Sequence, residues 1–381
     1  MTFDPALFGS KLKRYRELFN FSLGDVSIAT GISEDYLSTL EKGVKRPTGD
    51  EVLILADYYK EDYNFFISNE QISTVEKTEP LYRRYGEDFS TEDRWAVQEF
   101  LFLCECEEFI MNLLPVRHYK AFKFVKQGNN FKRHGQEAAA ELRQHLGYSF
   151  NQVKMNIYED FRDLGFHIFR RQLGNSNISG LFIKHPSAGK CILVNYSEDV
   201  YRQRFTVAHE TAHAILDDEQ DFVVSFKWDK KNLSEVRANN FASSYLMPPE
   251  FLQGIPDSKQ WDSEKAIHWA SQLKVSTEAL AYALKNVGLI SGDVEEQIKA
   301  VKVPAAFKVD PELPESLLPK SRQRREELLR RGLSTSYVGL CFDAYEQGVI
   351  SAGRMAEMLL VDERELSEMA SIYNRSLRYG D

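Results

Sequence analysis

Residues 204–219 read RFTVAHETAHAILDDE, and this stretch contains an H-E-x-x-H pattern with histidines at His209 and His213. Apolar residues on both sides of the pattern favour a helix. Side chains four residues apart lie on one face of a helix, so both imidazoles can reach one metal ion. Glu210 then lies beside them, where it can polarise a bound water. The spacing therefore predicts a zinc site built on a helix.

A catalytic zinc needs a third protein ligand and one open position. In the run SEVRANNFASSYLMP, residues 234–248, Glu235 heads a second predicted helix whose small residues permit close packing on the first. Glu235 is the better candidate, although the helix dipole also favours any glutamate in a first turn. Asp217, one turn after the motif, is the second candidate. The metzincin extension fails, because Leu216 and Glu219 stand where it needs Gly and His.

These two runs together resemble the ImmA/IrrE family of zinc-dependent peptidases, over about residues 136–290. The family pattern is an R-F-T-x-A-H-E-x-x-H helix, followed by an E-x-x-A-N-x-F-A helix that ends in Leu-Met-Pro. The resemblance implies one Zn²⁺ per chain, held by His209, His213 and Glu235, with Glu210 as the catalytic base. It also implies a substrate, namely a DNA-bound repressor or antitoxin-like protein whose cleavage derepresses stress or mobile-element genes.

Other parts of the site are less clear from the sequence. Tyr245 and Arg237 are candidates for the oxyanion donor, by proximity alone. An extended substrate could pair with a hairpin strand such as Cys191 to Val194. The simpler interpretation of that hairpin is a sheet scaffold.

The N-terminal residues 9–59 resemble an Xre/Cro-type helix-turn-helix, with a tight turn at Gly31 and a recognition helix that starts after Ser33. Glu34 could accept a hydrogen bond from a cytosine amino group, and the basic residues after the helix could hold phosphate. The residues expected to contact DNA are Ser33, Glu34, Tyr36, Ser38, Lys42, Lys45 and Arg46.

The charge of this N-terminal segment argues against simple DNA binding. Residues 1–68 hold eight Lys/Arg and eleven Asp/Glu, a net charge of −3, whereas phosphate contacts need the opposite balance. The alternative is a dimerisation or repressor-docking module. If the segment does read DNA, we expect a homodimer on a two-fold operator, because one such module contacts only a half-site.

The composition is that of a soluble, folded protein of more than one domain. The 381 residues include 48 Lys/Arg and 57 Asp/Glu, a net charge of −9, which argues against a protein that coats nucleic acid but leaves room for one small DNA-reading module. Four cysteines make no disulfide framework. With no apolar signal core and no membrane-length apolar run, we expect a cytoplasmic protein with no membrane association.

Between residues 136 and 247 the sequence predicts four helices, a β-like run FHIFRR at 166–171 and a hairpin. The hairpin consists of GLFIKH and KCILVN, separated by the turn at residues 186–189. Residues 115–135 contain six Lys/Arg and no acid, so they could follow a nucleic-acid backbone, but a hairpin or linker with a solvated basic face is the simpler interpretation. The predicted helices cover 136–147, 151–165, 198–216 and 234–247.

The fold class expected is multidomain and mainly α: an N-terminal all-α helix-turn-helix, an α+β gluzincin-like zinc peptidase domain and a small C-terminal helical domain. The leading function is a cytoplasmic zinc metallo-endopeptidase linked to transcription. The rivals are a DNA-binding regulator whose peptidase-like domain is a sensor or docking module without proteolysis, and one half of a toxin–antitoxin-like pair. The expected domains are a helix-turn-helix (1–68), a helical connector (69–135), the peptidase domain (136–300), a proline-rich linker (301–320) and the C-terminal helical domain (321–381).

Overall fold

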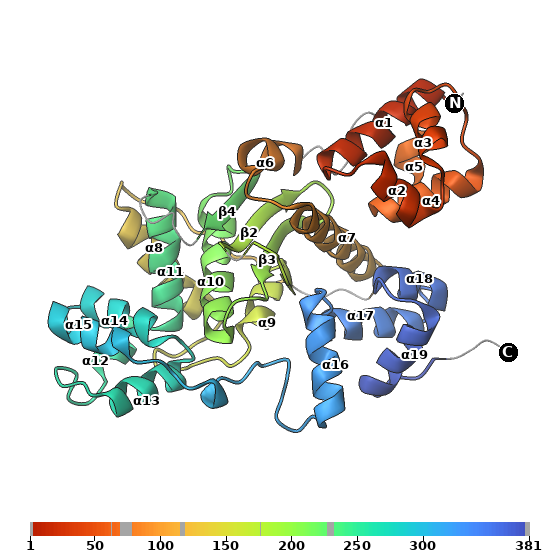
Figure 1. Ribbon diagram of the computed structural model, residues 1–381. Coiled ribbons are helices and arrows are strands. Elements are labelled where there is room, and N and C mark those ends of the chain that lie inside the picture. The colour runs from red at the N-terminus through yellow and green to blue at the C-terminus, as the bar shows by residue number, and fades with distance from the viewer. Residues whose placement is uncertain are drawn as a thin grey trace. The chain divides into compact units, whose positions relative to one another are not determined.

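The computed structural model describes residues 3–61, 63–68, 78–114, 119–175, 177–226 and 232–377. The chain divides into two compact units, and Figure 1 labels the elements of each. The first unit is Met1–Glu105 with Leu173–Asn175, and the second is Cys106–Gln172 with Ser176–Asp381. Among the described residues, no helix combines the length and apolar character that crossing a membrane requires.

The first unit begins with five helices that enclose one apolar core. Gly31 ends the second of them in the left-handed conformation, with φ 74°, as the predicted tight turn requires. Gly9 lets the first helix approach the third, since a Cβ there would lie 2.2 Å from the carbonyl oxygen of Leu40. Phe8, Leu12 and Tyr15, at helical spacing on α1, are all buried. The helices are α1 (Pro5–Leu18), α2 (Leu23–Thr30), α3 (Glu34–Glu41), α4 (Gly49–Tyr59) and α5 (Tyr63–Ile67).

Side-chain caps define where these helices start. Ser22 and Asp25 form a reciprocal capping box on α2, and Thr48 and Glu51 form another on α4. Ser33 occupies the N-cap position of α3, as predicted, but its side chain makes no capping hydrogen bond. Two further helices follow, α6 (Thr78–Tyr85) and α7 (Thr91–Leu113), and the boundary between the two units falls within α7.

The second unit is built around a four-stranded mixed sheet in the order β1-β3-β2-β4. The predicted hairpin is confirmed: β2 and β3 pair antiparallel, with Leu181 opposite Leu193. A fourth strand that the sequence did not predict pairs with β2 at the edge of the sheet. The strands are β1 (His167–Arg171), β2 (Ile178–His185), β3 (Gly189–Asn195) and β4 (Phe222–Phe226).

This strand order corrects the expectation for substrate pairing. Cys191 to Val194 belong to β3, which lies inside the sheet with β1 on one side and β2 on the other. Both edges of β3 are therefore already hydrogen-bonded, and no peptide can add to it. The edge strands of the sheet are β1 and β4, and among the described residues each is paired with one neighbouring strand only.

The helices of the second unit lie in layers on this sheet. α10 packs on β2 and β3, α11 packs on α10, and α8 packs on α11. Gly135 of α8 permits the last contact, since a Cβ there would lie 2.3 Å from the carbonyl oxygen of Arg237. These helices are α8 (Phe131–His145), α9 (Ile157–Arg162), α10 (Val200–Leu216) and α11 (Leu233–Leu246).

Two of the predicted helix boundaries were wrong. α8 starts five residues before the expected 136, because Asn130 caps it, and α9 is much shorter than the expected 151–165. In the basic stretch, residues 119–130 form no strand, so the hairpin alternative is wrong and they connect α7 to α8; residues 115–118 lie outside the described part. Phe122 and Phe124 of this connector pack against the core.

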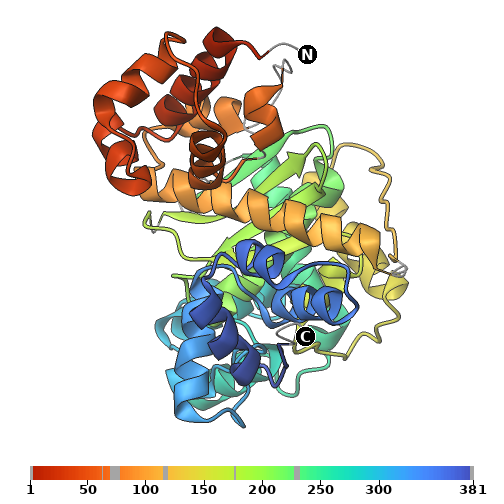
Figure 2. The same cartoon turned by 90° about the vertical axis from the view of Figure 1, so that its right-hand side faces the viewer.

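The C-terminal part of the second unit is helical, as expected. Figure 2 shows its last four helices gathered together. The proline-rich stretch 301–320 is more than a linker, because Asp310 is buried and pairs in bidentate fashion with Arg170 of β1, at 2.6 and 3.0 Å. The elements are α12 (Pro249–Gln253), α13 (Ser263–Leu273), α14 (Thr277–Asn286), α15 (Gly292–Ala300), a 3₁₀ turn (Ala305–Phe307), α16 (Pro319–Arg330), α17 (Thr335–Glu346), α18 (Ala352–Met358) and α19 (Glu363–Ile372).

Candidate metal centre

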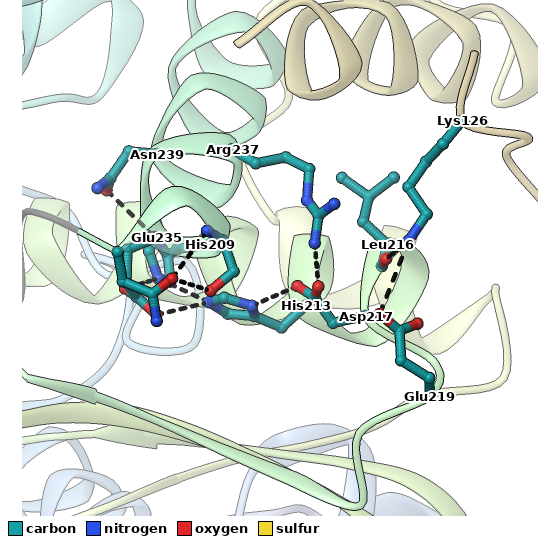
Figure 3. A network of polar contacts seen from close by, with 11 residues as sticks. Lys126, His209, His213, Leu216, Asp217, Glu219, Glu235, Arg237 and Asn239 are labelled. Carbon is teal, nitrogen blue, oxygen red and sulfur yellow. Dashed lines mark hydrogen bonds and ion pairs between the residues drawn. The ribbon is translucent and has the colours of Figure 1, made fainter. Parts of the chain in front are cut away.

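The two histidines of the motif lie on one buried face of α10, one turn apart. Their Nε2 atoms face each other at 3.2 Å (Figure 3). α11 brings Glu235 to the same point, with Oε2 at 3.0 Å from His209 Nε2 and Oε1 at 3.2 Å from His213 Nε2. In the described part of the chain these three side chains form the one cluster of metal-ligand type.

The spacing of the three atoms fits a metal ion. At a zinc–ligand distance of about 2.1 Å, neighbouring ligand atoms of a tetrahedral site lie about 3.4 Å apart. The observed separations among His209, His213 and Glu235 are 3.0 to 3.2 Å. The two nitrogens and the Glu235 carboxylate, which meets each nitrogen through a different oxygen, therefore surround a place where one small cation could be held.

The hydrogen bonds on the far side of each ring strengthen this argument. His209 Nδ1 lies 3.1 Å from Asn239 Oδ1, and His213 Nδ1 lies 2.8 Å from Asp217 Oδ2. Asp217 accepts, and Asn239 accepts through its amide oxygen as assigned, so each ring carries its proton on Nδ1. Two Nε2 lone pairs and a carboxylate then point at one place, an arrangement that needs positive charge there.

Without a metal, a proton supplies that charge. Burial alone would lower the pKa of His213, but hydrogen bonds to Asp217 and Glu235 raise it to about 10. Burial alone would raise the pKa of Glu235, but hydrogen bonds from His209 and His213 bring it well below its ordinary range. A metal ion must therefore displace a proton from this cluster.

Glu210 lies beside the cluster and contacts no ring nitrogen. Its side chain is fully buried, and within the described residues neither carboxylate oxygen has a hydrogen-bond partner. Burial raises the pKa of Glu210, against the opposing charges of His209 and His213. A buried carboxylate with free lone pairs can accept and return a proton.

The strand β2 leaves the space that Glu210 occupies. A Cβ at Gly180 would lie 3.0 Å from Glu210 Oε1 and 2.7 Å from Thr206 Cγ2. The pairing of β2 with β4 shifts register between Ile178 and Gly180, as a β-bulge does. The role of Gly180 was not predicted, although a glycine inside a predicted strand is a signal of close approach by a neighbouring group.

Neither predicted oxyanion donor lies in the cleft. Arg237 pairs with Asp217, on the far side of His213 from the other two ligand atoms, and stacks over Phe131 at 5.2 Å. The hydroxyl of Tyr245 donates to Asp160 Oδ2 at 3.2 Å. Both side chains are buried in the packing around the site, so both assignments are wrong.

A cleft of about 360 Å³ opens onto the cluster. His209, Glu210 and Glu235 line it, together with residues of three other elements. The edge strand β4 contributes Ser225 and Phe226. Apolar and aromatic side chains of α10, α14 and the preceding turn complete the wall: Tyr201, Phe205, Val275, Ala279 and Tyr282.

The residues expected to contact DNA are arranged differently. Ser33, Glu34, Lys42, Lys45 and Arg46 are exposed, whereas Tyr36 and Ser38 are half-buried. The Tyr36 hydroxyl donates to Glu51 at 3.2 Å, and Lys45 lies 5.0 Å from the Tyr36 ring. Arg46 lies over the ring of Phe3, at 5.5 Å, and donates to its carbonyl oxygen. The structure places these side chains along α3 and the turn after it, with no common focus.

Comparison with known proteins identifies two domains. Residues 161–285 match the family model of the IrrE N-terminal-like domain, peptidase family M78, and residues 7–62 match a helix-turn-helix domain. The chain thus contains an IrrE/ImmA-like peptidase-family domain and an N-terminal helix-turn-helix, as the resemblances predicted.

The other comparisons add little. No curated protein matches the sequence significantly. The crystal structure of Bacillus thuringiensis PlcR in complex with the peptide PapR7 and DNA aligns over 97% of this chain and 93% of that chain. Its sequence identity is 10% and its TM-score is 0.17, too low to establish a shared fold.

Proposed function

We propose that this protein is a transcription-linked zinc metallo-endopeptidase that cleaves a repressor or antitoxin-like protein and so derepresses stress or mobile-element genes. The observation that carries the proposal is the convergence of His209, His213 and Glu235 within 4.8 Å of one another in a cleft, beside the unpartnered carboxylate of Glu210. His209, His213 and Glu235 would hold one Zn²⁺ per chain.

When bound, zinc would act as a Lewis acid that lowers the pKa of a bound water towards ~7 and polarises the peptide carbonyl. Glu210 takes the proton from the attacking water and then gives it to the leaving amide nitrogen. Its raised pKa suits both steps, since a carboxylate that holds a proton more tightly is a better base near neutral pH. Asn239 and Asp217 hold the two imidazoles in the required orientation.

The substrate segment is expected to bind as an extended strand. β4 pairs with β2 along one side only, and its residues Ser225 and Phe226 line the cleft. An edge strand offers unpaired backbone groups to which a peptide can add. The backbone of the substrate would then run across the cluster, with its scissile carbonyl near Glu210.

A helix-turn-helix in the same chain supports a substrate that is itself found on DNA. Operator DNA is the proposed second partner, bound by a homodimer through Ser33, Glu34, Tyr36, Ser38, Lys42, Lys45 and Arg46. The rival function is a DNA-binding regulator in which the peptidase-like domain senses metal or docks a partner without cleaving it.

Two variants distinguish these functions. Glu210→Gln keeps the shape of the side chain and removes its basicity, so it should keep about one zinc per chain and lose cleavage by ~10²–10⁴-fold. His209→Ala should lose both metal and cleavage. The measurements are zinc content by mass spectrometry and, if a helix-turn-helix repressor is encoded beside this gene, an immunoblot of that repressor in cells that express each variant.

If cleavage is the function, both variants should fail to derepress. A Glu210→Gln protein that regulates normally while the repressor stays intact would remove the peptidase activity and support the sensor function.

A further inference from the structure

Asp217 is an acidic residue that hydrogen-bonds to the cluster without being one of its three members. Its Oδ2 lies 2.8 Å from His213 Nδ1, and its Oδ1 pairs with Arg237 Nη2 (Figure 3). The side chains of His213, Asp217 and Arg237 are all buried, with 0, 3 and 6% exposed. Asp217 therefore contacts the nitrogen of His213 that points away from the proposed metal position, so it cannot be the third ligand.

Burying a negatively charged Asp217 at this position is unfavourable in free energy unless a cation compensates it. Asp217 is the C-cap residue of α10, where the helix dipole disfavours a negative charge, and its side chain is removed from water. Asp218 and Glu219 follow it directly. A buried carboxylate at this end of a helix needs a specific cation, and Arg237 supplies it.

Other cations neutralise the backbone of the same helix end. Lys126 donates to the carbonyl oxygen of Leu216 at 2.7 Å, and Lys190 donates to that of Ala214 at 2.5 Å. Neither lysine contacts an imidazole. They stabilise the end of α10, whereas the pair Asp217–Arg237 acts on a ring that faces the cluster.

The two imidazoles are supported unequally. His209 has only the neutral amide of Asn239 on its Nδ1, at 3.1 Å, whereas His213 has a charged pair. Arg237 and Glu235 both come from α11, so this helix supplies the carboxylate at His213 Nε2 and the cation that pairs with Asp217, the partner of Nδ1. A carboxylate on the outer nitrogen fixes the tautomer and makes the other nitrogen a stronger ligand.

We propose that Asp217 and Arg237 act together as positioning residues that set the metal affinity of the site through His213. The pair holds the ring with Nε2 directed at Glu235 and His209. This inference rests on the proposed function only in requiring that the cluster binds a metal.

The test measures Zn²⁺ dissociation constants by competition with a chelator, for the full chain and four variants. Asp217→Ala should weaken binding by about 10–100-fold, the usual effect of removing an outer partner of a ligand histidine. Asp217→Asn can still accept the Nδ1 proton but lacks the charge, so its loss should be smaller. Arg237→Met should weaken binding in the same direction, because Asp217 loses the cation that orients it.

The matched control is Lys126→Met, which removes the hydrogen bond to the Leu216 carbonyl oxygen at the same end of α10 and changes no group that contacts an imidazole. It should stay within about twofold of the wild type. The absorption spectrum of bound Co²⁺ gives a second readout, since altered ring orientation in Asp217→Asn should change its ligand-field bands even if Asp217→Ala fails to fold.

The outcomes separate the two proposals. A wild-type chain that binds no zinc would remove the proposed function. A wild-type chain that binds zinc, with Asp217→Ala and Asp217→Asn binding it equally well and showing the same Co²⁺ spectrum, would overturn only the role of the pair. An equal loss in Lys126→Met would also overturn it, because the effect would then be general to the helix end.

Discussion

In the helix pair α10–α11 the functional side chains are buried and converge, whereas along α3 of the first unit they are exposed and point to no common place. His209, His213 and Glu235 have almost no contact with solvent. Glu34 and Lys45 are exposed, and Lys45 lies over the ring of Tyr36 in its own module.

The difference shows how far a static fold can specify a function. Buried polar groups must be satisfied where they are, so their packing determines what they can bind. Exposed charged side chains can rearrange at little cost, so α3 is compatible with DNA or with a protein partner. The predictions below test this contrast.

The largest effect is expected from the third side chain of the cluster. Removing Glu235 should weaken zinc binding roughly a thousandfold, if site energies of about 10–16 kcal/mol are shared among three protein ligands. Zinc content by mass spectrometry after dialysis checks Glu235→Ala. The control is Glu219→Ala, an exposed glutamate just past the same helix, which should keep its metal. Equal metal content in Glu235→Ala and wild type would show that Glu235 is not a ligand of the metal.

His167 is also buried against carboxylates, so it tests whether this environment alone is enough to make a metal site. Burial alone would lower its pKa, but hydrogen bonds to Glu107 and Glu108 raise it to about 10. The folded pKa lies above the ordinary value near 6.5, so the stabilisation is complete below about pH 6.5 and disappears as the pH rises through 10.

Unfolding by urea at pH 6, 8 and 10 should show wild type losing a few kcal/mol relative to His167→Gln over this range. His167→Gln should keep its zinc. A constant difference between the two proteins across the pH range would show that His167 is not charged in the folded state.

Two glycines allow the contrast to be tested in the backbone. Gly180→Ala places a methyl group against Glu210 and Thr206, so it should cost about 1–3 kcal/mol of stability and reduce cleavage by roughly 10–100-fold. Gly31→Ala meets no atom within 4 Å but sits at φ 74°, so it should cost about 1 kcal/mol and leave cleavage of a peptide substrate unchanged. Thermal unfolding and peptide assays measure both, and full activity in Gly180→Ala would show that Glu210 has room to move.

The smallest effects are expected on DNA. Lys45→Ala with Arg46→Ala should weaken binding to every sequence and lower the slope of log affinity against log salt by about two, one for each lost phosphate contact. Glu34→Ala should instead relax base preference, by about 1–3 kcal/mol at one position. Gel shifts with the protein's own promoter at several salt concentrations distinguish these effects. No shift at micromolar protein and low salt would favour the docking module.

The sequence by itself determined the features that depend on local geometry. The four-residue spacing of His209 and His213 places both rings on one face of any helix, and the run from Ser22 to Thr48 carries the caps and the glycine of a helix-turn-helix. Both domain types followed from the family resemblances that these motifs carry, and the comparisons confirm them.

Only the tertiary structure decided which groups meet. It brought Glu235 to the Nε2 atoms of His209 and His213, and Asp217 to Nδ1 of His213, although both are acidic residues that follow the motif in the sequence. It placed Arg237 behind the site, and it put β4, rather than the strand with Cys191, at an edge of the sheet beside the cleft. The reason is physical: helix periodicity is set within a few residues, whereas the partner of a buried side chain depends on which elements pack together and at what depth.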